Sequence, residues 1–207
     1  MSLAIVYTRA ALGIEAPLIT VEVHLSNGLP GLTMVGLPET TVKEARDRVR
    51  SALINSGYAF PAKKITINLA PADLPKEGGR YDLPIALALL VASEQLNTTR
   101  LNQYEFVGEL ALTGGLRGVP GAIPSAMEAI KAGRRIVVSS DNAAEVGLIG
   151  GSDCLVADHL QEVCAFLAGQ TSLSPPLAEA PARDERYEDL LDVIGQQQGK
   201  RALEIVA

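Results

Sequence analysis

The stretch Ile65-Thr-Ile-Asn-Leu-Ala-Pro71, followed by Pro75-Lys-Glu-Gly-Gly-Arg80 and Tyr81-Asp-Leu-Pro-Ile-Ala86, sets the architecture of this chain. In its first part, apolar and polar residues alternate, which predicts a strand with one buried face. Proline and glycine then mark a turn. The apolar run from Leu83 to Gln95 is long enough for a helix and predicts one that is largely buried.

Apolar periodicity elsewhere predicts strands and helices in the order βββαβαβαβαβα. Turn residues 26–31 predict that residues 18–36 form an antiparallel hairpin. The fold class that we expect is α/β (α+β), a mixed sheet flanked by helices. The expected strands are Ala4–Thr8, Leu18–Leu25, Leu32–Val35, Ile65–Leu69, Glu105–Leu112, Arg135–Val138 and Cys154–Ala157, and the helices are Thr41–Ser56, Leu83–Gln95, Ile123–Ala132, Ala143–Leu148 and Leu160–Leu167.

Composition favours a cytoplasmic globular protein with one substantial core. The chain has 207 residues, of which 47% are hydrophobic and 20% charged. No apolar run is long enough to cross a bilayer, and the first residues do not form a secretory signal, so we expect no membrane contact. Two cysteines fit a reducing compartment. The net charge of −6 excludes a global attraction to nucleic acid, which would need a local basic patch.

A change in composition predicts the domain boundaries. Residues 1–168 alternate strands and helices and form the main domain, whereas proline, alanine and charge without periodicity predict a linker over 169–187. Residues 188–207 then form a separate segment.

The glycines at Gly78 and Gly79 precede a helix, as they do in phosphate-binding loops. We expect a structural turn instead, because Asp82 stands at the predicted N-cap, where its carboxylate would accept from the free amides and repel an anion. The Gly-Lys-Ser or Gly-Lys-Thr of a P-loop occurs nowhere in the chain.

The chain offers few ligands for a metal ion. His24, Cys154, His159 and Cys164 lack the paired spacings of a zinc site, so we predict no metal site. With only these two histidines, a Ser-His-Asp triad is rejected as well.

Nucleic-acid binding has one local candidate. Arg46 and Arg50 share a stripe of the predicted helix, and the same helix also offers acids at positions that suit ion pairs. We favour an ordinary solvent-exposed helix face with ion pairs over a nucleic-acid site, because no aromatic residue is interleaved with these bases for stacking. The bases of the candidate are Lys43, Arg46, Arg50, Lys63 and Lys64, and the acids are Glu39, Glu44 and Asp47.

Three stretches together resemble the Lon-type proteolytic domain and its inactive relatives: Ile65–Leu69 with Pro75-Lys-Glu-Gly-Gly79, Gly108-Glu-Leu-Ala-Leu-Thr-Gly114, and Val119-Pro-Gly-Ala122 to Lys131-Ala-Gly133. This resemblance implies a degenerate Lon-type fold. It places the nucleophilic serine of the family at or next to Arg80 and the activating lysine at Ile123.

Neither replacement can perform the chemistry of the residue that it replaces. A guanidinium is no nucleophile, and an isoleucine takes no proton. Ser125 is near in sequence, but Lys131 stands six positions further along the same helix and faces another side. We therefore expect no catalytic residue, and a peptidase is rejected. Whether Arg80 has acquired a new role stays open.

The whole chain resembles the YifB or ComM family of magnesium-chelatase-like AAA+ proteins. The resemblance lies in Leu29-Pro-Gly-Leu-Thr-Met-Val-Gly36-Leu-Pro-Glu39, Asn68-Leu-Ala-Pro-Ala-Asp-Leu-Pro75 and Gly79-Arg-Tyr-Asp-Leu-Pro84. It implies a homo-hexameric ATPase acting in DNA branch migration, with helicase activity, during natural transformation. This chain would be its N-terminal accessory or assembly domain, without catalysis of its own.

The end of the chain extends the resemblance. Asp189-Leu-Leu-Asp-Val-Ile-Gly-Gln196 and Lys200 to Ala207 are similar to the opening of an AAA+ module, so residues 188–207 would be the start of that module, ending before its P-loop. The resemblance places Val193, Ile194 and Gly195 against adenine. ATP and Mg²⁺ are therefore expected only in the full-length protein, which would be the ATPase.

Two alternatives remain open. One is a magnesium-chelatase-type ATPase subunit that remodels a protein partner, and the other is a purely structural oligomerisation domain.

Overall fold

The computed structural model describes residues 2–36, 42, 44–149, 153–176 and 190–206. The strands are β1 (Ser2–Arg9), β2 (Leu18–Ser26), β3 (Gly31–Val35), β4 (Lys64–Ala70), β5 (Tyr104–Phe106), β6 (Glu109–Leu110), β7 (Leu116–Arg117), β8 (Arg135–Ser139) and β9 (Cys154–Ala157). The helices are α2 (Ala45–Asn55), α3 (Asp82–Ala92), α4 (Ala122–Lys131), α5 (Ala143–Gly147), α6 (Leu160–Leu167) and α7 (Gln197–Val206), and the 3₁₀ turns are η1 (Gly79–Tyr81), η2 (Leu101–Gln103), η3 (Ser140–Asn142) and η4 (Leu190–Asp192).

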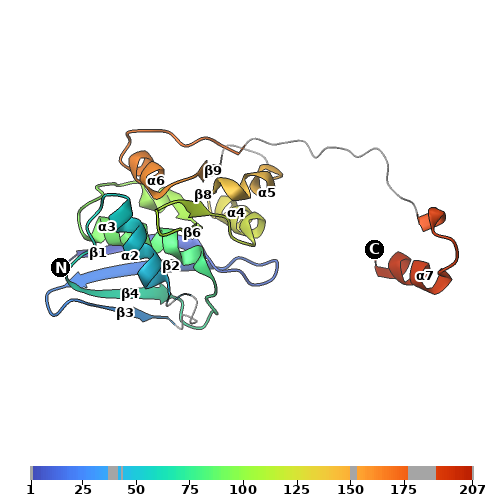
Figure 1. Ribbon diagram of the computed structural model, residues 1–207, viewed down its shortest axis with the longest axis horizontal. Coiled ribbons are helices and arrows are strands. Elements are labelled where there is room, and N and C mark those ends of the chain that lie inside the picture. Colours follow the sequence, from blue (N-terminus) through green and yellow to red (C-terminus); the bar gives the residue numbers. More distant parts are fainter. Residues whose placement is uncertain (1, 37–41, 43, 150–152, 177–189, 207) are drawn as a thin grey trace.

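Within the described part of the chain, the strands form a seven-stranded sheet in the order β3-β4-β2-β1-β5-β8-β9 and a separate ribbon of β6 and β7 (Figure 1). Strand β2 is antiparallel to both of its neighbours, β1 and β4. The other neighbouring pairs of the sheet are parallel. The mixed α/β architecture predicted from the sequence is confirmed.

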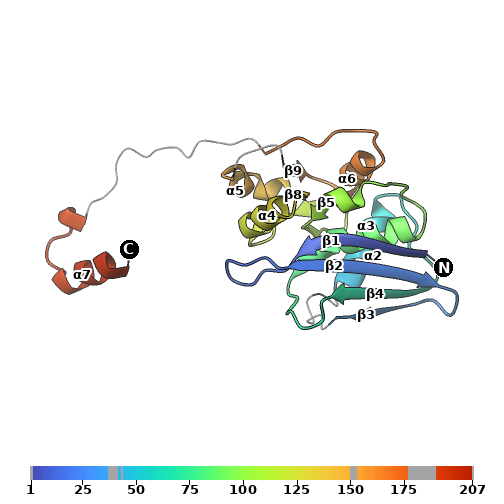
Figure 2. The same cartoon turned by 180° about the vertical axis from the view of Figure 1, so that it is seen from behind.

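The two halves of the sheet are covered differently. In β8, Val137 packs into the main core cluster, whereas Ile136 and Val138 pack with α4 and α5 in a second cluster, so helices cover both faces there. Along β2, buried residues alternate with half-buried ones. No helix lies in front of β1, β2, β4 and β3 in Figure 2. Antiparallel strands with one solvated face give this alternation, whereas parallel strands are usually covered on both faces.

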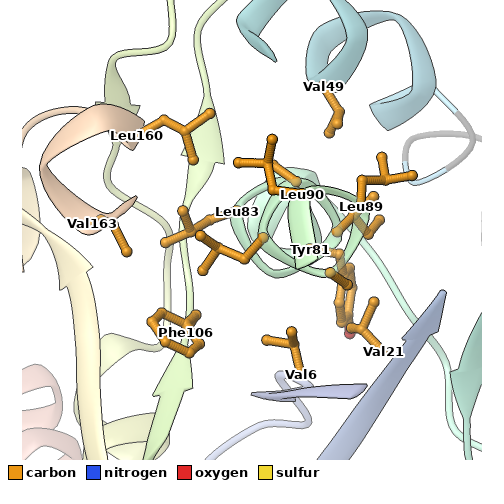
Figure 3. Close-up of a cluster of buried hydrophobic side chains, with 14 of the residues drawn as sticks. Val6, Val21, Val49, Tyr81, Leu83, Leu89, Leu90, Phe106, Leu160 and Val163 are labelled. Carbon is orange, nitrogen blue, oxygen red and sulfur yellow. The ribbon is translucent and has the colours of Figure 1, made fainter. Parts of the chain in front are cut away.

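Helix α3 is the centre of the main core. Ten of its eleven residues are buried, which confirms the helix expected from the apolar run, although it ends at Ala92 and not at Gln95. Figure 3 shows the helix end-on, with Val6 and Val21 of the sheet on one side and Val49 of α2 on another. Side chains from α6 complete the enclosure. Because the helix is covered on all sides, its sequence is apolar on all sides.

The predicted hairpin over residues 18–36 is wrong. Strand β3 does not pair with β2, because β4 lies between them and pairs with β3 in parallel. The physical reason is burial. Ile65, Ile67 and Leu69 of β4 are fully buried, so this strand takes the inner position, whereas the apolar side chains of β3 are half-buried or exposed and this strand takes the edge.

The expected strand Glu105–Leu112 is also wrong in its extent. The chain leaves the large sheet after Phe106, and the amide of Gly108 donates to the carbonyl oxygen of Arg80 at 3.2 Å. The amide of Leu83 in turn donates to the carbonyl oxygen of Gly108 at 3.1 Å. These bonds hold the chain at the start of α3, so Glu109 and Leu110 pair with β7 in the ribbon instead.

The sheet domain runs past the boundary expected at residue 168. The amide of Val156 in β9 donates to the carbonyl oxygen of Ser174 at 3.0 Å, and Leu173 packs against the main core. The rest of the expected linker lies largely outside the described residues, as do Glu39 and Lys43. Among the described residues, no helix has both the length and the apolar character that a membrane span requires.

A buried carboxylate, that of Glu105 on β5, joins the two halves of the sheet. It has no solvent exposure and accepts from the guanidinium of Arg9 at 2.6 and 2.7 Å, and from Arg134 at 2.9 Å. The Arg134 guanidinium also lies 4.6 Å from the centroid of the Tyr7 ring. A desolvated charge is tolerated here because two cations compensate it.

We predict that Glu105→Gln lowers the free energy of unfolding by about 3 kcal/mol or more, because it leaves two cations without their partner at a buried site. Urea unfolding of the chain, followed by circular dichroism, measures the change. The matched control is Glu128→Gln, which removes an exposed ion pair with Lys131. Equal stability of Glu105→Gln and the control would contradict the assigned role.

Candidate functional site

The loop between β4 and η1 is held by a buried lysine. Lys76 has no solvent exposure, and its ammonium donates to the carbonyl oxygens of Leu74, at 2.7 Å, and Pro71. Burial lowers the pKa of this ammonium. Both of these acceptors are backbone groups of the same loop, so the lysine fastens the loop to itself.

Arg80 occupies the place at which the resemblance puts a nucleophilic serine. Its side chain is buried, and its guanidinium donates to the carbonyl oxygens of Arg9, at 3.1 Å, and Pro120. Burial lowers the pKa of the group. Arg80 therefore ties η1 to the end of β1 and to the turn before α4, and these contacts give it a positioning role and no nucleophilic one.

The other residues considered for a serine–lysine catalytic pair lie in different surroundings. Ile123, at the lysine position, is half-buried on α4. The hydroxyl of Ser125 is buried and donates to the carbonyl oxygen of Gly121 at 2.8 Å. Lys131 is exposed and pairs with Glu128 at 2.6 Å. Serine and lysine thus point to different surroundings on the same helix, as their spacing predicts.

A cavity of about 290 Å³ lies next to this loop. Its polar side chains are the carboxylates of Glu77 and Glu109 and the guanidinium of Arg80, and none of the described residues that line it is a serine, threonine or cysteine. Gly79 packs against Glu109 so closely that an added Cβ would lie 2.3 Å from a carboxylate oxygen. This arrangement offers no nucleophile for acyl transfer.

Asp82 is not the N-cap residue expected from the sequence. Tyr81 occupies that position, and Asp82 is the first residue of α3 with no solvent exposure. Its carboxylate accepts from the Arg48 guanidinium at 2.7 and 3.1 Å and from the amide of Leu110 at 3.2 Å. The carboxylate therefore points away from the free amides of the helix, toward α2 and the β6–β7 ribbon.

Opposing effects act on the pKa of Asp82. Burial raises it to about 6, and the hydrogen bond and charge of Arg48 and the Leu110 amide act in the other direction. The same pairing raises the pKa of Arg48, chiefly through its hydrogen bond to Asp82. Loss of hydration is thus the larger effect on the carboxylate.

His159 and the two cysteines have structural surroundings. In His159, which caps α6, Nδ1 accepts from the amide of Gln161 at 3.1 Å and Nε2 lies 3.1 Å from the carbonyl oxygen of Thr113. Both ring nitrogens therefore already have a backbone partner. The Ser56 side chain also lies near the ring, beside Gly114. Cys154 and Cys164 are buried and free. Within the part of the chain that the structure describes, no three potential metal ligands cluster together.

A groove between α2, β3 and the start of β4 gathers the basic residues singled out in the sequence. It has a volume of about 240 Å³, and Arg46, Arg50 and Lys63 line it. All three are exposed. Lys64 does not line the groove. Neighbouring residues of a strand point to opposite faces of the sheet, so its side chain points away from the face that carries Ile65.

The ion pairs expected on α2 form only in part. Arg48 lies 3.8 Å from Glu44, but its main partner is the buried Asp82. Among the described residues, Arg46 and Arg50 have no salt bridge. Phe60 was not predicted from the sequence as part of this candidate site, and its ring centroid lies 5.4 Å from the Arg50 guanidinium. It stands ten positions beyond Arg50 in the sequence, so no helical periodicity could have connected the two.

Val193, Ile194 and Gly195, expected against adenine, lie between η4 and α7. The side chain of Ile194 is 97% exposed, and that of Val193 is exposed as well. Gly195 has a φ of +78°, in the left-handed region that favours glycine. The adenine contact stays a prediction.

Comparison with known proteins agrees with the sequence resemblance. A family model described as "Subunit ChlI of Mg-chelatase" matches residues 21–142. The chain is 75% identical over 207 residues to the uncharacterized protein YifB of Salmonella typhimurium, and the alignment covers all of the chain and 41% of that protein. It is 56% identical over 214 aligned positions to the competence protein ComM of Haemophilus influenzae, covering all of the chain and 42% of ComM. The chain thus spans less than half the length of these relatives.

The buried Asp82 predicts a pH-dependent stability. Because its folded-state pKa of about 6 lies above its ordinary value near 4, its contribution is fully present below about pH 4 and is lost as the pH rises through about 6. The difference in unfolding free energy between the protein and Asp82→Asn should change across this window by at most about 1.4 kcal/mol per pH unit. Urea titrations at several pH values measure it, and a flat difference would contradict the shift.

For the loop, we predict that Arg80→Ala lowers the free energy of unfolding by about 1–3 kcal/mol, because two buried carbonyl oxygens lose their donors. Thermal and urea unfolding measure the effect. Arg46→Ala is the control, since an exposed arginine without a salt bridge among the described residues should change stability by less than about 0.5 kcal/mol. Equal stability of the two variants would show that the loop does not depend on Arg80.

Proposed function

Because the chain belongs to the family of Mg-chelatase subunit ChlI, together with the YifB and ComM proteins, we propose that it is the accessory N-terminal domain of a hexameric AAA+ ATPase. The complete protein would drive DNA branch migration, with helicase activity, during natural transformation, in the cytoplasm. The domain itself would guide DNA or help to assemble the ring.

The observation that carries this proposal is the 56% identity to the competence protein ComM, which extends over the whole chain. The site geometry supports a role without catalysis for the domain. At the serine position of the Lon-type resemblance, Arg80 is committed to two backbone carbonyl oxygens. The neighbouring ammonium of Lys76 is likewise committed to its own loop.

ATP and Mg²⁺ would be bound by the full-length protein. The apolar side chains of Val193 and Ile194 are exposed and suit the face of an adenine ring, and the segment before α7 would thus be the leading edge of the nucleotide site. Hydrolysis of ATP would supply the energy for movement. In this chain, these residues would bind and orient the base.

The family match favours a second candidate function. A protein of the Mg-chelatase type would remodel a protein partner and would not respond to DNA. A purely structural oligomerisation domain would build rings while binding neither DNA nor nucleotide. The three possibilities differ in what stimulates ATP hydrolysis by the complete protein.

We expect branched DNA to stimulate ATP hydrolysis by the full-length protein, and the protein to separate a labelled four-way junction. Deletion of residues 1–176, which removes the sheet domain with its last paired residue Ser174, should strongly reduce junction separation. Gel analysis of the junction and a coupled ATPase assay measure the two effects. The intact protein with a blocked ATP site serves as the control for spontaneous melting of the junction.

ATP hydrolysis that is indifferent to DNA in the intact protein would overturn the proposal in favour of the partner-remodelling function. Full junction separation by the deleted protein would show that the sheet domain does not contribute. Rings that form only when residues 1–176 are present, without any effect on DNA, would identify a structural oligomerisation domain.

A further inference from the structure

We propose that the groove lined by Arg46, Arg50, Lys63 and Phe60, called here the α2 groove, binds the phosphate backbone of single-stranded DNA. This inference rests on the proposed function and adds the surface at which the domain itself meets the strand. It reverses the preference for an ordinary solvated helix face that the charge pattern of α2 gives.

The first support is the local charge. Among the residues that the structure describes, those lining the α2 groove include three cations and no carboxylate, on a chain whose net charge is −6. The neighbouring acid Asp47 is exposed, and among the described residues it forms no salt bridge with Arg46 or Arg50. Such a concentration of positive charge attracts a polyanion even when the whole protein does not.

The second support is the spacing of the cations. Arg46 and Arg50 stand one helical turn apart on α2, which places their Cβ atoms about 6 Å from one another. Two guanidinium groups in a row at this separation can contact successive phosphates of one strand. Lys63, from the segment before β4, lines the same groove from another element. The groove therefore presents cations from two elements to one path.

The third support is the aromatic ring. Phe60 is half-buried and lines the groove, with the Arg50 guanidinium 5.4 Å from its ring centroid. Proteins that bind single strands without sequence preference combine a positive groove with aromatic side chains on which bases stack. The floor is apolar, made by Leu32 and Ile65 among others. The groove has a volume of about 240 Å³.

An ion pair with the core fixes the rotation of α2 about its axis. Arg48 turns inward to the buried Asp82. On a helix, positions two residues away point about 200° around the axis, so Arg46 and Arg50 are directed to the opposite side, toward the α2 groove. Contacts of α2 with the core therefore fix the direction in which Arg46 and Arg50 point.

The test uses the full-length protein and a fluorescein-labelled oligothymidylate, with binding measured by fluorescence anisotropy at several salt concentrations. The double variant Arg46→Ala/Arg50→Ala should raise Kd at least roughly tenfold. Its plot of log Kd against log salt concentration should become shallower by about 1.4, because two phosphate contacts are lost. Phe60→Leu, which keeps the groove apolar but removes the ring, should raise Kd by roughly tenfold.

Lys64→Ala is the matched control, since it removes an adjacent exposed cation that lies outside the groove, and it should leave Kd within about twofold. Ring assembly and thermal unfolding of each variant confirm that the fold is intact. In addition, irradiation of a bound strand that contains 5-iododeoxyuridine should yield a crosslink at Phe60, identified by mass spectrometry.

If the wild-type protein binds the strand and hydrolyses ATP in response to DNA, while the double variant keeps its Kd and salt dependence and no crosslink forms at Phe60, the α2 groove is not the site and the proposed function stands. If the wild-type protein binds no DNA at all, the groove inference and the proposed function fail together.

Discussion

The ion pair between Asp82 and Arg48 is the constraint on which the arrangement of the domain depends. The carboxylate belongs to the first residue of α3, a helix with ten of its eleven residues buried, where an isolated charge would be strongly unfavourable. Arg48 supplies the counter-charge from α2, and the Leu110 amide supplies a further donor from the ribbon. One buried carboxylate therefore fixes α2, α3 and the ribbon relative to one another.

This constraint reaches the surface because a helix is rigid around its axis. Once Arg48 is turned toward the core, Arg46 and Arg50, each two positions away, point to the opposite side of α2. Arg46 and Arg50 then face β3 and the start of β4 without a salt bridge in the described chain, beside the Phe60 ring. A requirement of the interior thus produces a positive groove on an acidic protein.

The sequence predicts what depends on local periodicity and not what depends on distant neighbours. Alternation in β2 and the apolar run of α3 identify their buried faces correctly, because each pattern reports the environment of its own residues. Which strand lies beside β2 is decided by β4, some forty positions further along, so the predicted hairpin failed. Asp82 has the residue type of an N-cap, but its partner Arg48 stands 34 positions earlier. Likewise, a count of acids and bases on α2 could not show that one base is withdrawn into the core.

The loop between β4 and α3, which resembles that of Lon-type domains in sequence, is held by two buried cations. Lys76 and Arg80 are both cations with lowered pKa values caused by burial, and both donate to backbone carbonyl oxygens. Carbonyl oxygens compensate the charges only in part, but the two that Arg80 contacts hold the loop against β1 and the turn before α4. A serine at position 80 could not make these bonds, since its single hydroxyl cannot reach two carbonyl groups from different elements. Arg80 is therefore the residue that ties this loop to its neighbours, and its side chain is committed to that structural role.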